Sequence, residues 1–310
     1  MEYETAGDPV SGCKWTRKTT EKIARQLRRA KIHVSPKTVA RLLKEMKFSL
    51  RVNVKTIESG SSKPLDPKHR DRQFRYIKRQ RQDYARRGLP VISVDAKKRE
   101  LIGSFRKDGR TWSRNGIEVF DHDFPSDAQG VGISYSIYDT GRNKGFVCVG
   151  TSYDTAEFAV DAIRRWWLKE GRHHYPDADE ILILADCGGS NSYRTRLWKY
   201  QLQIAFCDRV GVKVRLCHYP PGTSKWNPVE HRLFSFISNN WAGRPLVSYE
   251  CMLNFIRTTK TKMGLGVRAC LIEKGYKKGI KISDDQMRQV VLKRYRVNPD
   301  WNYSITPSKM

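Results

Sequence analysis

The feature that most limits the possible folds is residues 181–185 (ILILA), which are apolar at every position and are followed at once by Asp186. A strand of this kind has both faces buried, and such strands are typical of parallel sheets that helices cover on both sides. Functional groups in such sheets usually lie at the carboxyl ends of the strands. The stretch therefore predicts an α/β fold with an aspartate at a functionally important edge of the sheet.

The segments around this strand alternate between strand and helix patterns. A short apolar run at 90–94 ends in Asp95, and two apolar runs around the turn DTGRNK predict a hairpin. From residue 90 the predicted order is strand 90–94, hairpin 132–138 and 145–151, helix 155–170, strand 181–185, helix 192–206, strand 212–217 and helix 228–241. This order predicts a mixed α/β sheet with helices on its faces.

Two short helices are predicted near the start of the chain, at residues 19–30 and 34–46. We expect Thr20 to cap the first helix, while Ser35 followed by Pro36 is typical of the start of the second. An apolar stripe on the second helix is expected to face inward: Val39, Leu42, Leu43 and Met46. Two helices around a tight turn indicate a helix-turn-helix, which would offer three side chains to DNA: Lys37, Thr38 and Arg41. A solvated basic helical hairpin is the alternative.

The chain carries a large excess of positive charge. It has 59 Lys and Arg residues against 32 Asp and Glu, a net charge of +27 over 310 residues. Residues 1–90 contain 24 basic and 9 acidic residues and so carry +15 of this excess. Because a soluble protein keeps such an excess when its partner is a polyanion, we expect the chain to bind nucleic acid.

The seven cysteines include no CxxC pair, which argues against a zinc ribbon and against a secreted disulfide framework. No apolar run approaches the ~18 residues of a membrane span. The first ten residues lack the basic and then apolar order of a signal peptide. We therefore expect a cytoplasmic protein with no membrane partner.

Three carboxylates are candidates for a common site. Asp95 and Asp186 each end a buried strand, and they would meet if the two strands are parallel neighbours. Glu230 lies about 100° from Val229 on a helical wheel, at the border of the arc expected to be buried. Alternatives remain for each, because Asn227 and Glu230 also fit a capping box and a lone aspartate after a strand is often a turn residue.

This set of residues suits hard metal ions. Three carboxylates without a His/Cys cluster favour Mg²⁺ or Mn²⁺, which bind carboxylates together with phosphate oxygens and water. Two such ions about 3.5 to 4 Å apart can activate an attacking oxygen and stabilise the leaving one in phosphodiester displacement. A basic chain with such a site is expected to cut or join DNA.

Five stretches of the chain, in order, resemble the DDE transposases of bacterial insertion sequences, specifically the ISAzo thirteen family: VISVDAKKRELIG, HDFP, YDTAEFAVDAIRRWW, ADCGGSN and PPGTSKWNPVEHRLFSFI. The likeness runs from about Trp15 to about Val291. It implies an RNase H-like core and makes Asp95, Asp186 and Glu230 the DDE triad. It also implies strand cleavage and strand transfer that use a pair of divalent metal ions. For the DNA, it implies a helix-turn-helix that recognises the element's terminal inverted repeats and a homo-oligomer that assembles on paired ends.

The resemblance suggests four regions, with a small all-α helix-turn-helix domain preceding an RNase H-like mixed sheet. They are a helix-turn-helix region at 1–50, a linker and basic helix at 51–88, an RNase H-like DDE catalytic domain at 89–260 and a basic C-terminal extension at 261–310. In the second region we expect Phe74, Ile77 and Tyr84 to face inward. The tail at 277–303 is interpreted as a further DNA-contacting surface.

Further side chains near the triad are candidates for DNA contact. The GGSN turn, with Gly188, Gly189, Ser190 and Asn191, would let backbone N–H groups and a helix N-terminus approach a phosphate, or else would only cap a helix through Ser190 or Asn191. Lys97, Lys98 and Lys225 would neutralise DNA near the metal ions, or else form a solvated face. His231 would contact the scissile phosphate, or else pack against its neighbours. Trp226 is expected to belong to the core with Trp166 and Trp167.

Two features depart from the family pattern. Cys187 stands where a glycine is expected, and the chain begins almost at the helix-turn-helix. The second feature leaves open a truncated or catalytically inactive relative that acts only as a DNA-binding protein. An RNase H-like nuclease acting on RNA-containing duplexes is a third possibility.

Overall fold

The computed structural model describes residues 6–7, 14–15, 18–50 and 67–308. The chain divides into two units, residues 1–56 and 57–310. Most of the predicted linker, residues 51–66, lies outside the described residues. Within the described ranges, no helix is both long and apolar enough to cross a membrane.

The first unit is built on the two predicted helices, α1 (Thr20–Arg29) and α2 (Pro36–Glu45). The hydroxyl of Thr19, not that of Thr20, caps α1 by accepting a hydrogen bond from the amide of Lys22 at 3.3 Å. Ser35 caps α2 as predicted, accepting from the amide of Thr38 at 3.0 Å. A short antiparallel pair, β1 (Ala6–Gly7) and β2 (Lys14–Trp15), is an addition that the sequence pattern does not predict.

The core of the first unit is small. Ile23, Ala24 and Val39 are buried, and Leu43 packs against them. The outer members of the predicted apolar stripe are exposed instead, Leu42 by 39% and Met46 by 59%. Two helices of ten residues each cannot enclose a full stripe between them, so that part of the prediction was wrong.

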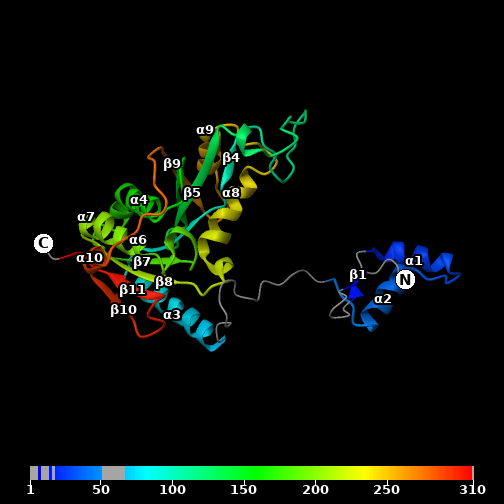
Figure 1. Cartoon of the computed structure of the whole chain (residues 1–310), viewed down its shortest axis with the longest axis horizontal. Coiled ribbons are helices and arrows are strands. Elements are labelled where there is room, and N and C mark those ends of the chain that lie inside the picture. The colour runs from blue at the N-terminus through cyan, green and yellow to red at the C-terminus, as the bar shows by residue number, and fades with distance from the viewer. Residues whose placement is uncertain (1–5, 8–13, 16–17, 51–66, 309–310) are drawn as a thin grey trace. The chain divides into compact units, whose positions relative to one another are not determined.

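The second unit is one mixed sheet with helices packed on its faces (Figure 1). Its central strands lie in the order β6-β5-β3-β7-β8, in which β5 is antiparallel to its neighbours and β3, β7 and β8 are parallel. Their bounds are β3 Val91–Ala96, β5 Gly130–Asp139, β6 Lys144–Gly150, β7 Glu180–Ala185 and β8 Lys213–His218. A short strand, β4 (Glu100–Ile102), pairs with β5. This is the strand order of the RNase H-like fold.

The last part of the chain extends this sheet at both edges. At one edge, β9 (Gly266–Ile272) lies parallel to β6. At the other edge, β11 (Asn302–Ile305) lies antiparallel to β8, and β10 (Leu292–Arg294) pairs with the outer side of β11. Residues 261–310 therefore share the sheet of the preceding residues. The boundary expected at residue 260 separates no structural unit.

The helices cover both faces. One apolar cluster packs α4 (Ala156–Trp166), α6 (Arg196–Gln201) and the π-helical turn η5 (Leu202–Cys207) on one face, and another packs η7, α8 and α9 on the other. The latter are η7 (Glu230–Phe234), α8 (Ser235–Asn240) and α9 (Tyr249–Arg257). The shorter elements are η2 (Pro125–Asp127), η3 (Trp167–Gly171), α5 (Arg172–His174), η4 (Gly189–Asn191), α7 (Asp208–Val210), η6 (Ser224–Trp226) and α10 (Asp284–Arg288).

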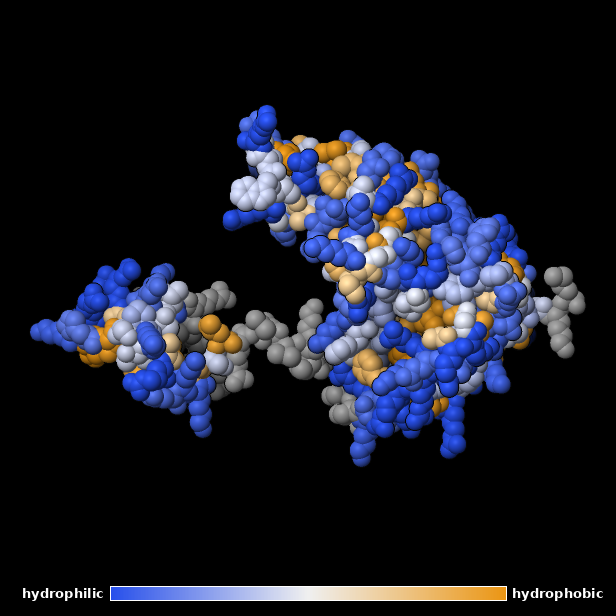
Figure 2. Space-filling model, turned by 180° about the vertical axis from the view of Figure 1, so that it is seen from behind, coloured by the Kyte–Doolittle hydropathy of each residue, from blue (hydrophilic) through white to orange (hydrophobic). Residues whose placement is uncertain are grey.

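The basic helix α3 (Pro67–Arg86) is longer than predicted and packs on β7 and β8. Ile77 and Tyr84 are buried, and Phe74 packs partly buried beside them. Gln73 is fully buried, and its amide nitrogen donates to the carbonyl of His218 at 2.8 Å and to the side chain of Asn302 at 2.9 Å. These bonds join α3 to the ends of β8 and β11. The rest of the unit's surface is predominantly hydrophilic on the side shown in Figure 2.

Candidate active site

Asp95 and Asp186 are brought to the same level on neighbouring strands. β3 and β7 are parallel, with Ser93 opposite Leu184. Each aspartate lies two residues further along its strand direction, so both side chains belong to the same face of the sheet. Adjacent strands are about 4.8 Å apart. The proximity expected from the two apolar runs is therefore present.

The loop before Glu230 is attached directly to β3. The side-chain oxygen of Asn227 accepts from the hydroxyl of Ser93 at 2.5 Å, and its amide nitrogen donates to the carbonyl of Val94 at 3.1 Å. The amide of Val229 donates to Ser93 Oγ at 2.9 Å. Asn227 and Ser93 are fully buried. These three bonds fix the start of the Glu230 helix beside the residue that precedes Asp95.

The capping-box alternative for Glu230 is not what the structure contains. The amide of Asn227, which such a box would pair with the glutamate, donates instead to the carbonyl of Ser224 at 2.7 Å. The carboxyl group of Glu230 interacts with that of Asp95. All three predicted carboxylates are thus neighbours at one edge of the sheet.

The helical wheel behind the Glu230 prediction needs a correction. The first turn of that helix is a π-helical turn, so the 100° spacing per residue of an α-helix does not apply to it. Phe234 is consequently buried, while Phe236, which was expected in the buried arc, is 38% exposed.

The electrostatics of the cluster oppose full ionisation. Asp95 is 9% exposed, and its burial, with the nearby charges of Asp186 and Glu230, raises the pKa of its carboxyl group. Burial also raises the pKa of Asp186, and the charges of Glu230 and Asp154 act in the same direction. The amide of Gly188 and the side chain of Asn191 donate to Asp186 Oδ1 at 3.2 and 3.3 Å and lower that pKa. The cluster is therefore short of positive charge.

The three carboxylates are the type of ligand that a hard divalent cation prefers. Within the described ranges, however, no group of three or more His, Cys, Asp and Glu side chains is placed so that it could hold a metal ion. Mg²⁺ is usually held by one or two carboxylates together with phosphate oxygens and water. Within the part of the chain that the structure describes, two buried polar atoms near the carboxylates have no hydrogen-bond partner: Tyr135 OH and Asn191 Oδ1. Unpaired buried polar atoms indicate that water or a ligand completes such a site.

The GGSN turn orients Asp186, and its Ser190 and Asn191 side chains are buried. Ser190 is 8% exposed and Asn191 is 1% exposed, so a DNA contact of this turn would have to be made by its backbone N–H groups, which stays a prediction. The side chain of Asn191 orients the carboxylate of Asp186. Gly189 has φ +63°, a conformation that favours glycine. Cys187 fits this turn, because its thiol donates to the carbonyl of Tyr219 at 2.9 Å.

The predicted lysines differ in their availability. Lys97 is already paired with Glu100 at 2.6 Å and lies over the ring of Trp241, so its charge is used within the protein. Lys98 and Lys225 are exposed, as is His231. Trp226 is 57% exposed beside Lys225, whereas Trp166 and Trp167 are buried as expected. An aromatic ring and a cation are thus exposed in the loop that leads to Glu230.

The candidate DNA-contacting residues of the first unit lie on the surface of α2. Lys37 and Arg41 are exposed, and Arg41 pairs with Glu45 at 3.0 Å. Thr38 is half-buried, and its hydroxyl lies 2.9 Å from that of Ser35.

Sequence reasoning missed two residues that act on Asp186: one holds its backbone, and the other adds a like charge that raises its pKa. His218 is fully buried, and its Nδ1 lies 2.7 Å from the backbone carbonyl of Asp186, while Nε2 lies 3.2 Å from the hydroxyl of Tyr303. Burial lowers the pKa of His218 to about 4, so the ring is neutral and Nδ1 carries the donated proton. Asp154 is the other, a largely buried carboxyl group whose charge acts on Asp186. Asp154 lies four residues after the end of β6. It therefore does not directly follow an apolar run, which was the pattern that indicated Asp95 and Asp186.

An open pocket of about 260 Å³ adjoins Asp186. Its walls are the Cys187–Gly188 turn, the Pro220–Gly222 loop, Tyr193 and Arg194. The pocket gives a polar ligand access to the carboxylate side of the sheet.

The fold and the carboxylate cluster together define an RNase H-like domain with an acidic centre. The chain belongs to the Rhodopirellula transposase DDE domain family, whose profile matches residues 1–307. The resemblance to DDE transposases inferred from the five sequence stretches is thereby confirmed.

Comparison with solved structures finds complexes of another transposase. The Mos1 transposase paired-end complex with the left transposon end is 14% identical, with a TM-score of 0.45, over 77% of this chain and 65% of that chain. The Mos1 Strand Transfer Complex is 15% identical, with a TM-score of 0.43, over 77% of this chain and 64% of that chain. The chain thus spans a little under two thirds of the length of these solved chains. No curated protein sequence gives a significant match.

Proposed function

We propose that this protein is an insertion-sequence transposase that cleaves DNA at the ends of its element and joins those ends to target DNA. One observation carries the proposal: Asp95 and Asp186 end neighbouring parallel strands, and the Asn227–Ser93 hydrogen bonds hold Glu230 beside them. This arrangement occurs in a strongly basic chain of a transposase DDE family. A protein of this kind acts in the cytosol, at the nucleoid.

Asp95, Asp186 and Glu230 would hold Mg²⁺ or Mn²⁺, most simply two ions, with phosphate oxygens of the DNA completing the coordination. Such ions, when bound, supply positive charge to the attacking and leaving oxygens of a phosphodiester displacement. The protein's own part is to fix the carboxylates. Asn191 and the amide of Gly188 orient Asp186, and Asn227 sets the position of Glu230.

Water attack would first free a 3′-hydroxyl at the element end, and that hydroxyl would then attack target DNA without a covalent protein intermediate. Lys98, Lys225 and His231 are exposed near the cluster and would contact the DNA backbone there. Lys37, Thr38 and Arg41 on α2 would contact the terminal inverted repeats, with two or more copies of the chain assembling on paired ends. The side chain of Asn191 would orient the carboxylate of Asp186, while backbone N–H groups of the turn at Ser190 and Asn191 would approach a DNA phosphate.

The test uses the full chain, Mg²⁺ or Mn²⁺, and duplexes that carry the element ends. Asp186→Asn and Glu230→Gln should abolish nicking and joining while leaving DNA affinity unchanged. Asp161→Asn is a matched control, because Asp161 is a half-buried carboxylate paired with Arg164 and Arg165 away from the cluster. Unchanged cleavage in both cluster variants would refute the assignment.

The same assay separates the other candidate functions. Binding to the inverted repeats with no metal-dependent cleavage would identify a DNA-binding relative without catalysis. Preferential cleavage of RNA–DNA hybrids over element ends would identify a nuclease of the same fold.

A further inference from the structure

A second charged site lies away from the carboxylate cluster, where β5 turns into β6 and where β9 begins. Lys144 pairs with Asp139 in this hairpin, three residues further along β5 than Ser136, which faces Asp95. Three residues correspond to about 10 Å along a strand, and β6 lies two strands, about another 10 Å, to the side of β3. The site is therefore separate from the carboxylates.

A pocket of about 450 Å³ occupies this place. Its walls carry six basic side chains and a single acidic one. The basic residues are Arg142, Lys144, His174, Arg257, Lys260 and Arg268. They come from the hairpin, from the end of α4 and its continuation, and from the segment that joins α9 to β9.

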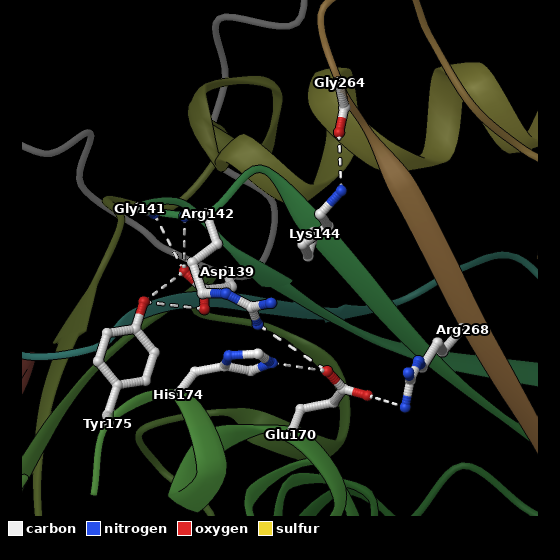
Figure 3. A network of polar contacts seen from close by, with 9 residues as sticks. All are labelled: Asp139, Gly141, Arg142, Lys144, Glu170, His174, Tyr175, Gly264 and Arg268. Carbon is white, nitrogen blue, oxygen red and sulfur yellow. Dashed lines mark hydrogen bonds and ion pairs between the residues drawn. The ribbon is translucent and has the colours of Figure 1, made fainter.

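The acidic residue, Glu170, holds part of this set in place (Figure 3). Glu170 is 9% exposed, and its Oε1 lies 2.5 Å from Arg268 Nη1. Its Oε2 lies 3.9 Å from Arg142 Nη1 and 3.5 Å from His174 Nε2. One carboxylate thus orients two guanidinium groups but neutralises only one of their charges.

The other basic residues of the pocket add positive charge, only part of which is paired with a carboxylate. Arg257 is paired with Glu250 at 2.9 Å. Lys144 donates to the backbone carbonyl of Gly264 at 3.0 Å, and within the described ranges no carboxylate forms an ion pair with Lys144 or Lys260. Asp139, a buried carboxyl group of the same hairpin, also interacts with the charge of Arg142. With Asp139 ionised and His174 neutral, the pocket keeps about two uncompensated positive charges.

A purely structural role explains Glu170 and its guanidinium partners, and the bond to Gly264 gives Lys144 a structural contact as well, but neither explains the positive charges of Lys144 and Lys260. Ion pairs to Glu170 tie the end of α4 to the hairpin and to β9, which is sufficient reason for those residues. Lys144 and Lys260 add like charges to a hollow that is already positive, which costs free energy unless an anion binds there. Guanidinium groups held in fixed positions suit phosphate oxygens, which accept paired hydrogen bonds from them.

We propose that this pocket binds phosphate groups of a DNA backbone, outside the carboxylate cluster, and so provides a second anchoring site for DNA on the catalytic unit. The proposal rests on the proposed function for its ligand, because DNA is the polyanion on which a transposase acts.

The test compares Lys144→Ala/Lys260→Ala with Arg209→Ala/Lys293→Ala in the full chain. The control pair removes two exposed cations of the same unit outside the pocket. Affinity for duplex DNA is measured at several salt concentrations. Loss of two phosphate contacts should reduce the slope of log affinity against log salt by about 2, so the deficit of the pocket variant should shrink about tenfold between 50 and 200 mM salt. Equal slopes for the pocket and control variants would overturn the proposal.

A charge change of opposite sign predicts the opposite change in affinity. Glu170→Gln keeps the shape of the side chain and makes the pocket more positive by one charge, so DNA should bind more tightly at low salt. The melting temperature should fall in either case, because Arg142 and Arg268 lose their charged partner, but unchanged or weaker binding by the folded variant would contradict the proposal.

Two further measurements complete the test. The first distinguishes DNA from a small anion as the ligand of the pocket, and the second distinguishes the pocket proposal from the proposed function. Stabilisation of the wild-type chain by inorganic phosphate, with DNA affinity unchanged in the lysine variant, would assign the pocket to a small anion and overturn the DNA proposal. If the wild type binds through the pocket but never cleaves, the proposed function fails and the pocket proposal stands.

Discussion

Asp95 and Glu170 are equally buried carboxyl groups in one unit, each 9% exposed, but their surroundings are opposite. Glu170 lies among Arg142, His174 and Arg268, so the protein itself compensates its charge. Asp95 lies beside Asp186 and Glu230, and the charges of both raise its pKa. A buried carboxylate without a protein cation needs a proton or a metal ion, so the comparison separates a carboxylate that stabilises the fold from one that costs stability and is available for chemistry.

The largest expected effect is on catalysis. Asp95→Asn should reduce metal-dependent strand cleavage by on the order of a thousandfold or more, equivalent to about 4 kcal/mol of barrier, because it removes a carboxylate from the proposed ion site. DNA affinity should be retained. A cleavage assay on element ends measures the rate, and a rate within tenfold of the wild type would remove Asp95 from the site.

Removal of the other carboxylate should affect folding instead. Glu170→Ala should lower the free energy of unfolding by about 2 kcal/mol, because it removes the ion pairs to Arg142 and to the largely exposed Arg268. Urea titration measures this loss. Asp95→Asn is the matched comparison and should not lower the stability of the metal-free protein. Equal destabilisation by both changes would contradict the distinction between the two carboxylates.

A third prediction concerns the attachment of Glu230. Asn227→Ala removes the bonds to Ser93 and Val94, and the buried carbonyl and hydroxyl that remain should cost about 2 kcal/mol of stability. Cleavage should also fall, because the position of Glu230 loosens, while DNA affinity remains. Thr223→Ala, a change at another buried polar residue of the same loop, serves as the control for general loop damage. If Asn227→Ala and the control reduce cleavage equally, Asn227 has no specific positioning role.

The smallest effect is on pH dependence. The pKa of Asp95 is raised in the folded state, so its contribution to stability is present below the unfolded pKa of about 3.9 and is lost as pH rises through the folded pKa. We expect the metal-free wild type to lose about 1 kcal/mol or more of stability over this range relative to Asp95→Asn. Mg²⁺ should restore the loss above neutral pH. Parallel stability curves for the two proteins, measured by urea titration, would exclude the coupling.

The sequence pattern could predict the centre of the fold and the meeting of two aspartates. An uninterrupted apolar run such as residues 181–185 leaves few folds open, and two such runs ending in aspartate place both carboxylates at one edge. The strands at the edges of the sheet were harder to predict from the sequence. β11 has four residues, and its pairing with β8 depends on contacts about 90 residues apart in sequence, which local patterns do not reveal.

The remaining differences have local physical causes. The π-helical turn at Glu230 changes which faces are buried, and a wheel that assumes α-helical spacing cannot anticipate it. Lys97 resembles a free cation in the sequence because its partner, Glu100, is recognised only once β4 folds beside it. The GGSN sequence predicts phosphate contact by backbone N–H groups or helix capping, and it does not indicate the bond from the Asn191 side chain to Asp186. Asn227 shows no sequence signal beyond its fit to a helix cap.

The strands that close the two edges of the sheet also set the order in which the protein can become functional. β9 completes one edge and β11 the other, and Tyr303 in β11 supplies the hydroxyl that meets His218, which in turn holds the backbone of Asp186. A ribosome must therefore deliver residue 305 before this support of the carboxylate cluster can form. The carboxylate cluster can reach its final arrangement only after this segment has been synthesised. A nascent chain that still lacks β11 would contain all three carboxylates but not the Tyr303 hydroxyl that contacts His218.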